Sequence, residues 1–240
     1  MSEVQCLILA GGLATRMRPL TERIPKALIP VAGRAFVDHQ LDWLAGHGVT
    51  EVVLSIGYRG DEIRAHVGDR TAGGLRVRYV DEGSNLRGTA GALRLALDEG
   101  VLEERFLVTY GDSFLPIDFG VVFRAFADGG APALMTVFRN DGRWDQSNVI
   151  FEDGRVVLYD KQRRGRPAAD FAYIDYGLSA LERRVIADEI PAGTKADLAE
   201  LFFALSRRGD LAGFEVQERF YEIGSPEGLE DFTGWLRKGG

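Results

Sequence analysis

The first half of the chain alternates between short apolar runs and segments with helical spacing, and this alternation constrains the fold more than any other feature. The apolar runs predict strands over residues 4–10, 50–58, 75–82 and 105–114. The segments between them place apolar residues three and four positions apart and predict helices over residues 36–48, 60–69 and 88–100. Strand–helix alternation of this kind builds a mostly parallel sheet with helices on both faces. We therefore predict an α/β fold.

The second half has a different pattern, in which strands follow one another through short turns. The predicted strands cover residues 131–139, 147–153, 155–161, 171–181 and 211–224, and the turn EDGR joins the second to the third. Helices are expected over residues 195–209 and 225–240, with Ser225 as the cap of the last one. No repeat or long linker separates the halves, so we predict a single domain over residues 1–240.

Composition and charge exclude several classes of function. The chain has 240 residues, of which 45% are hydrophobic, and a net charge of −7, which disfavours binding to nucleic acid. The apolar runs are too short to cross a bilayer, and the N-terminus lacks the pattern of a secretion signal. The lone Cys6 excludes an intramolecular disulfide and fits a reducing compartment. We expect a cytoplasmic protein without nucleic-acid or membrane partners.

Two glycines follow the first strand directly and are close to several cations. Gly11 and Gly12 expose backbone N–H groups that can hold phosphate oxygens, although two glycines alone fit a tight turn equally well. Residues 1–34 hold five basic residues against two acidic ones, and Arg16 and Lys26 are both suited to phosphate. Together these features predict a confined anion site at the end of the first strand. The pattern is neither G-x-G-x-x-G nor a Walker A loop, which disfavours a dinucleotide-dependent oxidoreductase.

The stretch LILAGGLATRMRPLTERIPKALIPVAGRAFVDHQL resembles the signature of the sugar-1-phosphate nucleotidyltransferases. Their usual pattern is an apolar strand, then G-G-x-G-T-R-[LM]-x-P-L-T, then P-K-x-[LM]-x-P-[VI], and Ala14 stands where glycine is usual. The similarity extends to DEGSNLRGTAGALRLAL, FLVTYGDSF, VVLYDK, AYIDYGLSAL and FYEIGSPEGLEDF. The pattern looks closest to mannose-1-phosphate or heptose-1-phosphate guanylyltransferases.

This resemblance implies a Rossmann-like three-layer α/β/α fold of the nucleotide-diphospho-sugar transferase type. Residues 1–115 would form the nucleotide-binding half and residues 116–240 the sugar-phosphate-binding half. The implied reaction is attack of a sugar 1-phosphate on the α-phosphate of a nucleoside triphosphate, with release of pyrophosphate. Arg16 would neutralise the leaving phosphates, and Lys26 would act beside the α-phosphate. The implied nucleotide contacts are Leu9, Ala10, Gly11, Gly12, Leu13, Ala14, Thr15, Glu82, Gly88 and Thr89.

The resemblance also implies a magnesium site and a sugar-phosphate site. Asp112 would hold Mg²⁺, and Glu222, which replaces the usual aspartate, would be its second ligand. The implied sugar-phosphate contacts are Asn148, Lys161 and Asp175. Each also fits an ordinary turn or surface residue. Asp160, Asp175, Tyr176 and Glu222 depart from the family pattern, which indicates an unusual sugar.

The sequence constrains the substrates less firmly. A carboxylate at Glu82 suits the N–H donors of guanine, so we expect guanylyl transfer. The resemblance implies a mannose- or heptose-type sugar 1-phosphate as the acceptor. Uridylyl transfer to N-acetylmuramate 1-phosphate or a similar sugar phosphate is the alternative, and thymidylyl and cytidylyl transfer are also open. A catalytically inactive homologue that binds a nucleotide sugar is a second alternative. The exposed helices carry no heptad pattern, and the sequence is compatible with a homodimer.

Overall fold

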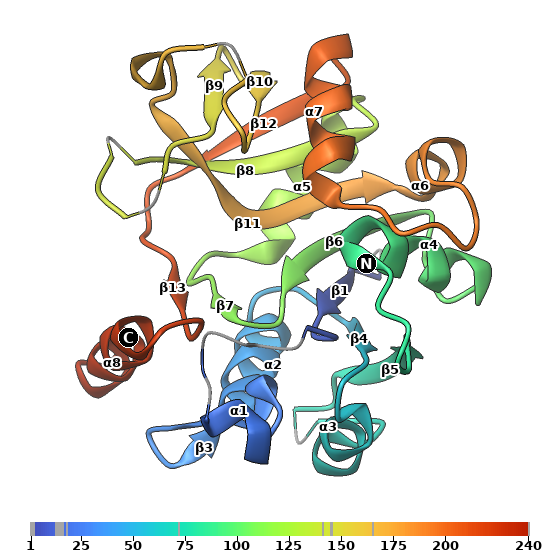
Figure 1. The fold of residues 1–240 in the computed structure, drawn as a ribbon, viewed down its shortest axis with the longest axis vertical. Helices are drawn as coiled ribbons and strands as arrows, with labels where there is room; N and C mark the ends of the chain where they lie inside the picture. Colours follow the sequence, from blue (N-terminus) through green and yellow to red (C-terminus); the bar gives the residue numbers. More distant parts are fainter. Residues whose placement is uncertain are drawn as a thin grey trace.

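A nine-stranded mixed sheet runs through the whole molecule (Figure 1). The computed structural model describes residues 3–12, 17, 19–71, 73–140, 142–144, 146–164 and 166–239. In sheet order the strands are β5 (Arg76–Asp81), β4 (Glu51–Ile56), β1 (Gln5–Leu9), β6 (Arg105–Tyr110), β11 (Tyr173–Glu182), β8 (Ala133–Arg139), β12 (Leu211–Val216), β10 (Arg155–Tyr159) and β9 (Val149–Glu152).

The four strands that the first half contributes to this sheet are parallel, so their carboxyl ends meet at one edge. β1 pairs in parallel with β4 and β6, and β4 pairs in parallel with β5. β11 joins the halves by antiparallel pairing with β6 on one side and β8 on the other. β8 and β12 are again parallel, and β10 and β9 form the predicted hairpin, with positive φ at Asp153 and Gly154. The α/β fold with a mostly parallel mixed sheet is thus confirmed.

Helices cover both faces of the sheet because the strand side chains alternate between two cores. Cys6 and Ile8 point into one core, and Leu7 points into the other. The first core is completed by α2 (Phe36–Gly46), α3 (Gly60–Val67) and α5 (Phe119–Gly129). The second is completed by α4 (Gly88–Asp98), α6 (Arg183–Glu189) and α7 (Leu198–Arg208). Three layers result, as predicted.

The C-terminal helix α8 (Pro226–Arg237) lies outside these layers, at the lower left of Figure 1. It buries Phe232 against Phe36 and Phe114 in a third, smaller core. The preceding strand β13 (Tyr221–Glu222) pairs with β7 (Ser113–Phe114), which follows β6. Ser225 caps α8 as predicted, because its hydroxyl accepts a 3.0 Å hydrogen bond from the N–H of Gly228.

The structure adds elements to those predicted from the sequence. The predictions placed no element at α5 or α6, and the segment 211–224, predicted as one strand, divides into β12 and β13. The remaining short elements are α1 (Leu20–Arg23), η2 (Lys26–Leu28), β2 (Pro30–Val31), β3 (Arg34–Ala35) and η3 (Ala168–Asp170). Within the described residues, each helix falls short of the length and apolarity that crossing a membrane requires.

Candidate active site

A cavity of about 400 Å³ opens where β1, β5 and β6 end, a volume within the range of small-molecule sites. It is lined by Leu9, Ala10, Gly11, Gly12, Lys26, Ala27, Glu82, Leu86, Gly88, Thr89, Ala92, Tyr110, Gly111 and Asp112. We call it the glycine cavity. Nine of these residues are ones for which the sequence predicts nucleotide, phosphate or metal binding. The parallel strands therefore bring segments from four parts of the first half to one place.

A side chain at either of two glycines in this wall would crowd a neighbour: the Glu82 carboxylate at Gly11 and the main chain of Ala10 at Gly111. A Cβ at Gly11 would lie 2.6 Å from Oε1 of Glu82, and a Cβ at Gly111 would lie 2.9 Å from Cα of Ala10. The N–H of Gly111 donates to the carbonyl of Leu9 at 2.9 Å, which ties the turn after β6 to the end of β1. The cavity wall at these glycines is therefore main chain, which suits phosphate oxygens.

Lys26 and Asp112 meet across the cavity. Nζ of Lys26 lies 2.7 Å from Oδ2 of Asp112, and 15% and 33% of the two side chains are exposed. Lys26 begins η2 directly after Pro25, whose φ of −64° fixes the approach of the chain. Asp112 lies in the turn between β6 and β7. An ammonium and a carboxylate in one cavity can bind a phosphate and a cation side by side.

Glu82 forms the wall beside the glycines. Its carboxylate accepts hydrogen bonds from the N–H of Arg87 at 2.8 Å and from the hydroxyl of Ser55 at 3.4 Å. Burial raises the pKa of Glu82, and the hydrogen bond from Arg87 opposes part of this rise. Two carboxylate oxygens keep lone pairs free for further N–H donors, such as those of a base.

The start of α4 carries Gly88 and Thr89, and the chain itself occupies part of their hydrogen-bonding capacity. The carbonyl of Ala196 accepts from the N–H groups of Ala90 and Gly91, at 3.0 and 3.2 Å. The hydroxyl of Thr89 donates to Asp197 at 3.1 Å. A segment of the second half therefore docks on the first turn of α4, next to two residues that line the cavity.

Four predicted residues of the glycine turn lie outside the described residues. They are Leu13, Ala14, Thr15 and Arg16. Their predicted nucleotide and phosphate contacts stay predictions.

The predicted sugar-phosphate residues lie together on the ends of β9, β10 and β11. We call Asn148, Asp160, Lys161 and Asp175 the polar cluster. The side-chain carbonyl of Asn148 accepts from the N–H of Asp175 at 3.0 Å, and its main-chain carbonyl accepts from the N–H of Asp160 at 2.9 Å. Burial raises the pKa of Asp175 to about 6, while its hydrogen bond from Gly177 and the charge of Lys161 pull the pKa down.

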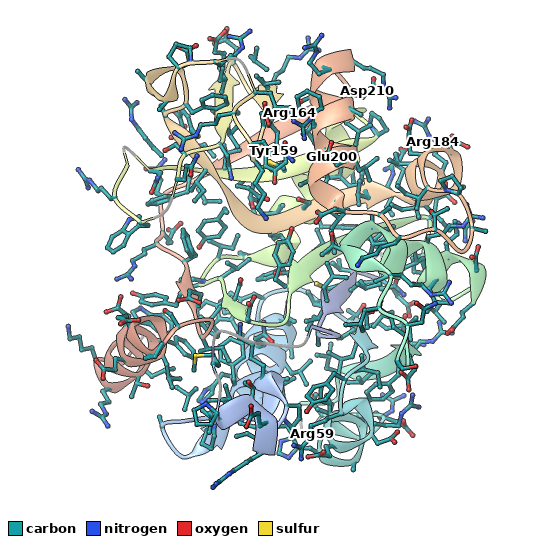
Figure 2. The ribbon with its side chains drawn as sticks, viewed as in Figure 1. Arg59, Tyr159, Arg164, Arg184, Glu200 and Asp210 are labelled. Carbon is teal, nitrogen blue, oxygen red and sulfur yellow. The ribbon has the colours of Figure 1, made fainter. Side chains whose placement is uncertain are left out.

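Lys161 is held in a tight turn after β10. The Asp160 carboxylate accepts from the N–H groups of Gln162 at 3.0 Å and Arg164 at 2.6 Å. Figure 2 shows Arg164 beside Glu200 of α7, with which it forms an ion pair. Asp160, which is 2% exposed, therefore supports the turn that presents Lys161.

Comparison with known proteins identifies the family. The model of the nucleotidyl transferase family matches residues 5–147, which is more than half of the chain. The chain belongs to the nucleotidyl transferase family. Among its relatives, mannose-1-phosphate guanylyltransferase from Mycobacterium tuberculosis is 30% identical over 235 residues, or 94% of this chain. N-acetylmuramate alpha-1-phosphate uridylyltransferase from Caulobacter vibrioides is 32% identical over 228 residues, or 92% of this chain.

These relatives differ in length. The chain spans 62% of the Mycobacterium enzyme and 92% of the Caulobacter enzyme. Among solved structures, HddC from Yersinia pseudotuberculosis complexed with GMP-PN matches with a TM-score of 0.79 and 25% identity, over 97% of this chain and 99% of that one. The fold is therefore that of the nucleotidyl transferases.

Glu222 is the predicted site residue with the most unexpected surroundings. β13 places it opposite Ser113, and the N–H of Ile223 donates to the carbonyl of Asp112 at 2.9 Å. Its carboxylate, however, accepts hydrogen bonds from the N–H of Gly224 and the hydroxyl of Ser225. The pairing of β13 with β7 thus brings the main chain at Glu222 next to that at Asp112. The Glu222 carboxylate nevertheless supports the turn before α8, and Glu222 is not among the residues that line the glycine cavity.

Members of this nucleotidyl transferase family generally depend on a divalent metal. Within the described residues, no three His, Cys, Asp or Glu side chains are grouped as a metal cage. Mg²⁺ at nucleotide sites commonly takes one or two carboxylates and completes its shell with phosphates and water. Asp112, partly exposed in the cavity, fits that donor set.

Tyr110 is one of five cavity residues for which the sequence analysis gave no role. It ends β6, and its position directly before Gly111 and Asp112 was the available signal. Burial raises the pKa of Tyr110 well above its usual value, and the charges of Asp175 and Asp112 add to the rise. The phenol therefore stays neutral, between the glycine cavity and the polar cluster.

Proposed function

We propose that this protein transfers a nucleoside monophosphate from a nucleoside triphosphate to a sugar 1-phosphate and releases pyrophosphate. The nucleotide we propose is GTP, and the acceptor is a mannose- or heptose-type sugar 1-phosphate. One observation carries the proposal: the ion pair of Lys26 and Asp112 lies in the same cavity as Gly11, Gly12 and Glu82. That arrangement supports a triphosphate site with a base pocket at one end.

The chemistry needs charge and position rather than a general base. The attacking oxygen of the sugar phosphate is already ionised, so the barrier comes from bringing two polyanions together. Lys26 would release Asp112 and place its ammonium beside the α-phosphate, where charge builds up. Arg16, by its sequence position, would neutralise the leaving phosphates. Lys161 would hold the phosphate of the sugar.

Asp112 is the residue we propose to hold Mg²⁺. When bound, the ion would neutralise phosphate charge and polarise the phosphate under attack. Releasing Lys26 frees Oδ2 of Asp112 for this role, so one contact between the two side chains would be exchanged for two contacts with substrate and metal. Glu222 stays a predicted second ligand, and using it would require its carboxylate to leave Gly224 and Ser225.

The preference for guanine rests on Glu82 and on the relatives. A carboxylate can accept hydrogen bonds from two adjacent N–H groups of guanine, whereas uracil offers one such group. The guanylyltransferase of Mycobacterium and the HddC complex with GMP-PN agree with this choice. We place the sugar phosphate at the polar cluster in the second half.

Pyrophosphate release tests the proposal directly. The four common nucleoside triphosphates are each combined with a panel of sugar 1-phosphates and Mg²⁺. We expect release with GTP and a mannose- or heptose-type acceptor, and a large loss of turnover in Arg16→Ala with the fold intact. Absence of turnover with every pair, together with measurable nucleotide-sugar binding, would favour an inactive binding homologue.

Uridylyl transfer to an N-acetylmuramate-type sugar phosphate is the second candidate. Its support is the Caulobacter uridylyltransferase, because the two chains match over 92% of the length of each. Turnover with UTP and not GTP in the same panel would select this candidate.

A further inference from the structure

We propose that Gln40 is a positioning residue that fixes the turn carrying Asp112. The inference rests on the proposed function, in which Asp112 holds the metal. Gln40 lies on α2, 72 positions before Asp112, near the end of the stretch that resembles the family signature, but the sequence analysis gave it no role. Its connection to the cavity appears only in the fold.

The Gln40 amide binds the turn on both sides of Asp112. Its Nε2 donates to the carbonyl of Ser113 at 2.6 Å and to the carbonyl of Tyr110 at 3.0 Å. The side chain is 5% exposed, so water does not compete readily for these carbonyls. The two bonded carbonyls enclose Gly111 and Asp112 between them.

Two further main-chain groups of this turn are also bound. The N–H of Gly111 donates to Leu9, and the carbonyl of Asp112 accepts from Ile223, both at 2.9 Å. With Gln40 in place, the main chain from Tyr110 to Ser113 is held from three directions. The Asp112 side chain is then the part of the turn that remains free to exchange Lys26 for a cation.

The amide orientation follows from the same contacts. Among the described residues, Oε1 of Gln40 is buried without a hydrogen-bond partner. A flipped amide would turn this oxygen toward two carbonyl oxygens, so donation by Nε2 sets the orientation. Glutamate at this position would oppose a carboxylate to both carbonyls, and methionine would leave both without their donor.

The experiment compares Gln40→Met with Gln5→Met. Gln5 is a matched control, since it is fully buried and its Nε2 also donates two bonds, to Glu51 at 2.6 Å and to Val101 at 2.9 Å. Its strand position is at the amino end of β1, whereas the cavity lies at the carboxyl end. Both variants lose two donated hydrogen bonds in the interior.

The first measurement is hydrogen exchange, and the second is Mn²⁺ affinity by electron paramagnetic resonance. We expect Gln40→Met to speed exchange at residues 110–114 and to weaken Mn²⁺ binding about 10- to 100-fold, the usual effect of losing a group that orients a metal ligand. Gln5→Met should speed exchange near residues 51 and 101–103 and leave Mn²⁺ affinity at the wild-type value.

Equal Mn²⁺ affinities in the wild type and both variants, including no binding in any of them, would overturn the positioning role. Turnover decides separately on the proposed function. A wild-type protein that binds Mn²⁺ through this turn and turns over no substrate pair would refute the function and retain the role of Gln40.

Discussion

The glycine cavity and the polar cluster use their charged side chains in different ways. In the cavity, Lys26 and Asp112 come from segments far apart in the sequence and form an ion pair with each other. In the polar cluster, Asp160 and Asp175 accept hydrogen bonds from N–H groups two to four residues further along the chain. The first arrangement leaves charge that ligands can take over, and the second uses charge to shape the chain.

This difference matches the pattern of departures from the family signature. Lys26 and Asp112, which fit the signature, line the cavity. Asp160 and Glu222 depart from it, and both carboxylates support local turns. We infer that recognition of the sugar depends mainly on Lys161, Asn148 and Asp175, because Asp160 is already fully engaged.

Removing the ammonium from the cavity should have the largest effect. In Lys26→Met we expect turnover to fall about 100- to 1,000-fold, as when one group that stabilises transition-state charge is lost. Pyrophosphate release at saturating substrates measures this. Lys161→Met is the matched control from the polar cluster and should act mainly on KM for the sugar phosphate. If Lys26→Met kept the wild-type turnover, the proposed difference between the glycine cavity and the polar cluster would be wrong.

Ionisation of Asp175 should lower stability. Its folded pKa of about 6 exceeds the ordinary value of 3.8, so the folded state binds the proton more tightly than the unfolded chain. Stability is therefore lost as the pH rises from 3.8 through about 6. In Asp175→Asn we expect a gain in unfolding free energy of up to about 3 kcal/mol near pH 8 that shrinks towards pH 4.

Urea unfolding at several pH values measures this difference. Asp128→Asn, at an exposed position of α5, serves as the control and should change little at any pH. A gain in Asp175→Asn that does not vary with pH would contradict the assignment of the titration to Asp175.

The contact between α4 and the second half depends on glycine at position 88. Gly88 has a φ of +74°, and a Cβ there would lie 2.5 Å from the carbonyl oxygen of Ala196. We expect Gly88→Ala to lower the unfolding free energy by about 2–3 kcal/mol. Gly100 has a φ of +67°, and a Cβ there would meet no atom within 4 Å. Gly100→Ala therefore isolates the backbone strain, and we expect it to lower the unfolding free energy by about 1 kcal/mol. Equal losses of unfolding free energy in Gly88→Ala and Gly100→Ala, measured by thermal unfolding, would show that the close contact with Ala196 adds no cost.

Glu222→Gln should have the smallest effect and sharpens the comparison most. Gly224 and Ser225 donate to different oxygens of the Glu222 carboxylate, so glutamine keeps an acceptor for only one of them and also loses the charge. We expect about 1 kcal/mol less stability and an unchanged Mg²⁺ requirement. Asp112→Asn, measured in parallel, should raise that requirement strongly. A matching rise in Glu222→Gln would restore the metal role that the resemblance implied.

The sequence predicted the first half better than the second for a physical reason. The strand ends of a parallel sheet must meet at one edge, so Gly11, Glu82 and Asp112 could be placed together without coordinates. α5 was missed although Phe119, Val122, Phe123 and Phe126 have helical spacing and Asp118 caps the helix. The sequence alone therefore indicates a helix at this position.

Other features could not be found from the sequence. The docking of Ala196 on α4 and the reach of Gln40 to Ser113 depend on how distant elements pack. The direction of the Glu222 side chain depends on whether its carboxylate binds the N–H and hydroxyl groups of the adjacent turn or points toward the cavity. A sequence motif gives the residue type at such positions but does not determine which groups the side chain of that residue contacts.

The antiparallel pairing of β6 with β11 has a consequence for how substrates enter and leave. Five successive residue pairs, from Thr109–Leu178 to Arg105–Glu182, join the two halves through the middle of one sheet. A hinge motion that separates the two halves as rigid bodies would have to break the hydrogen bonds between β6 and β11. For the proposed reaction we therefore expect the loops above the strand ends to admit the substrates, with the sheet beneath them unchanged.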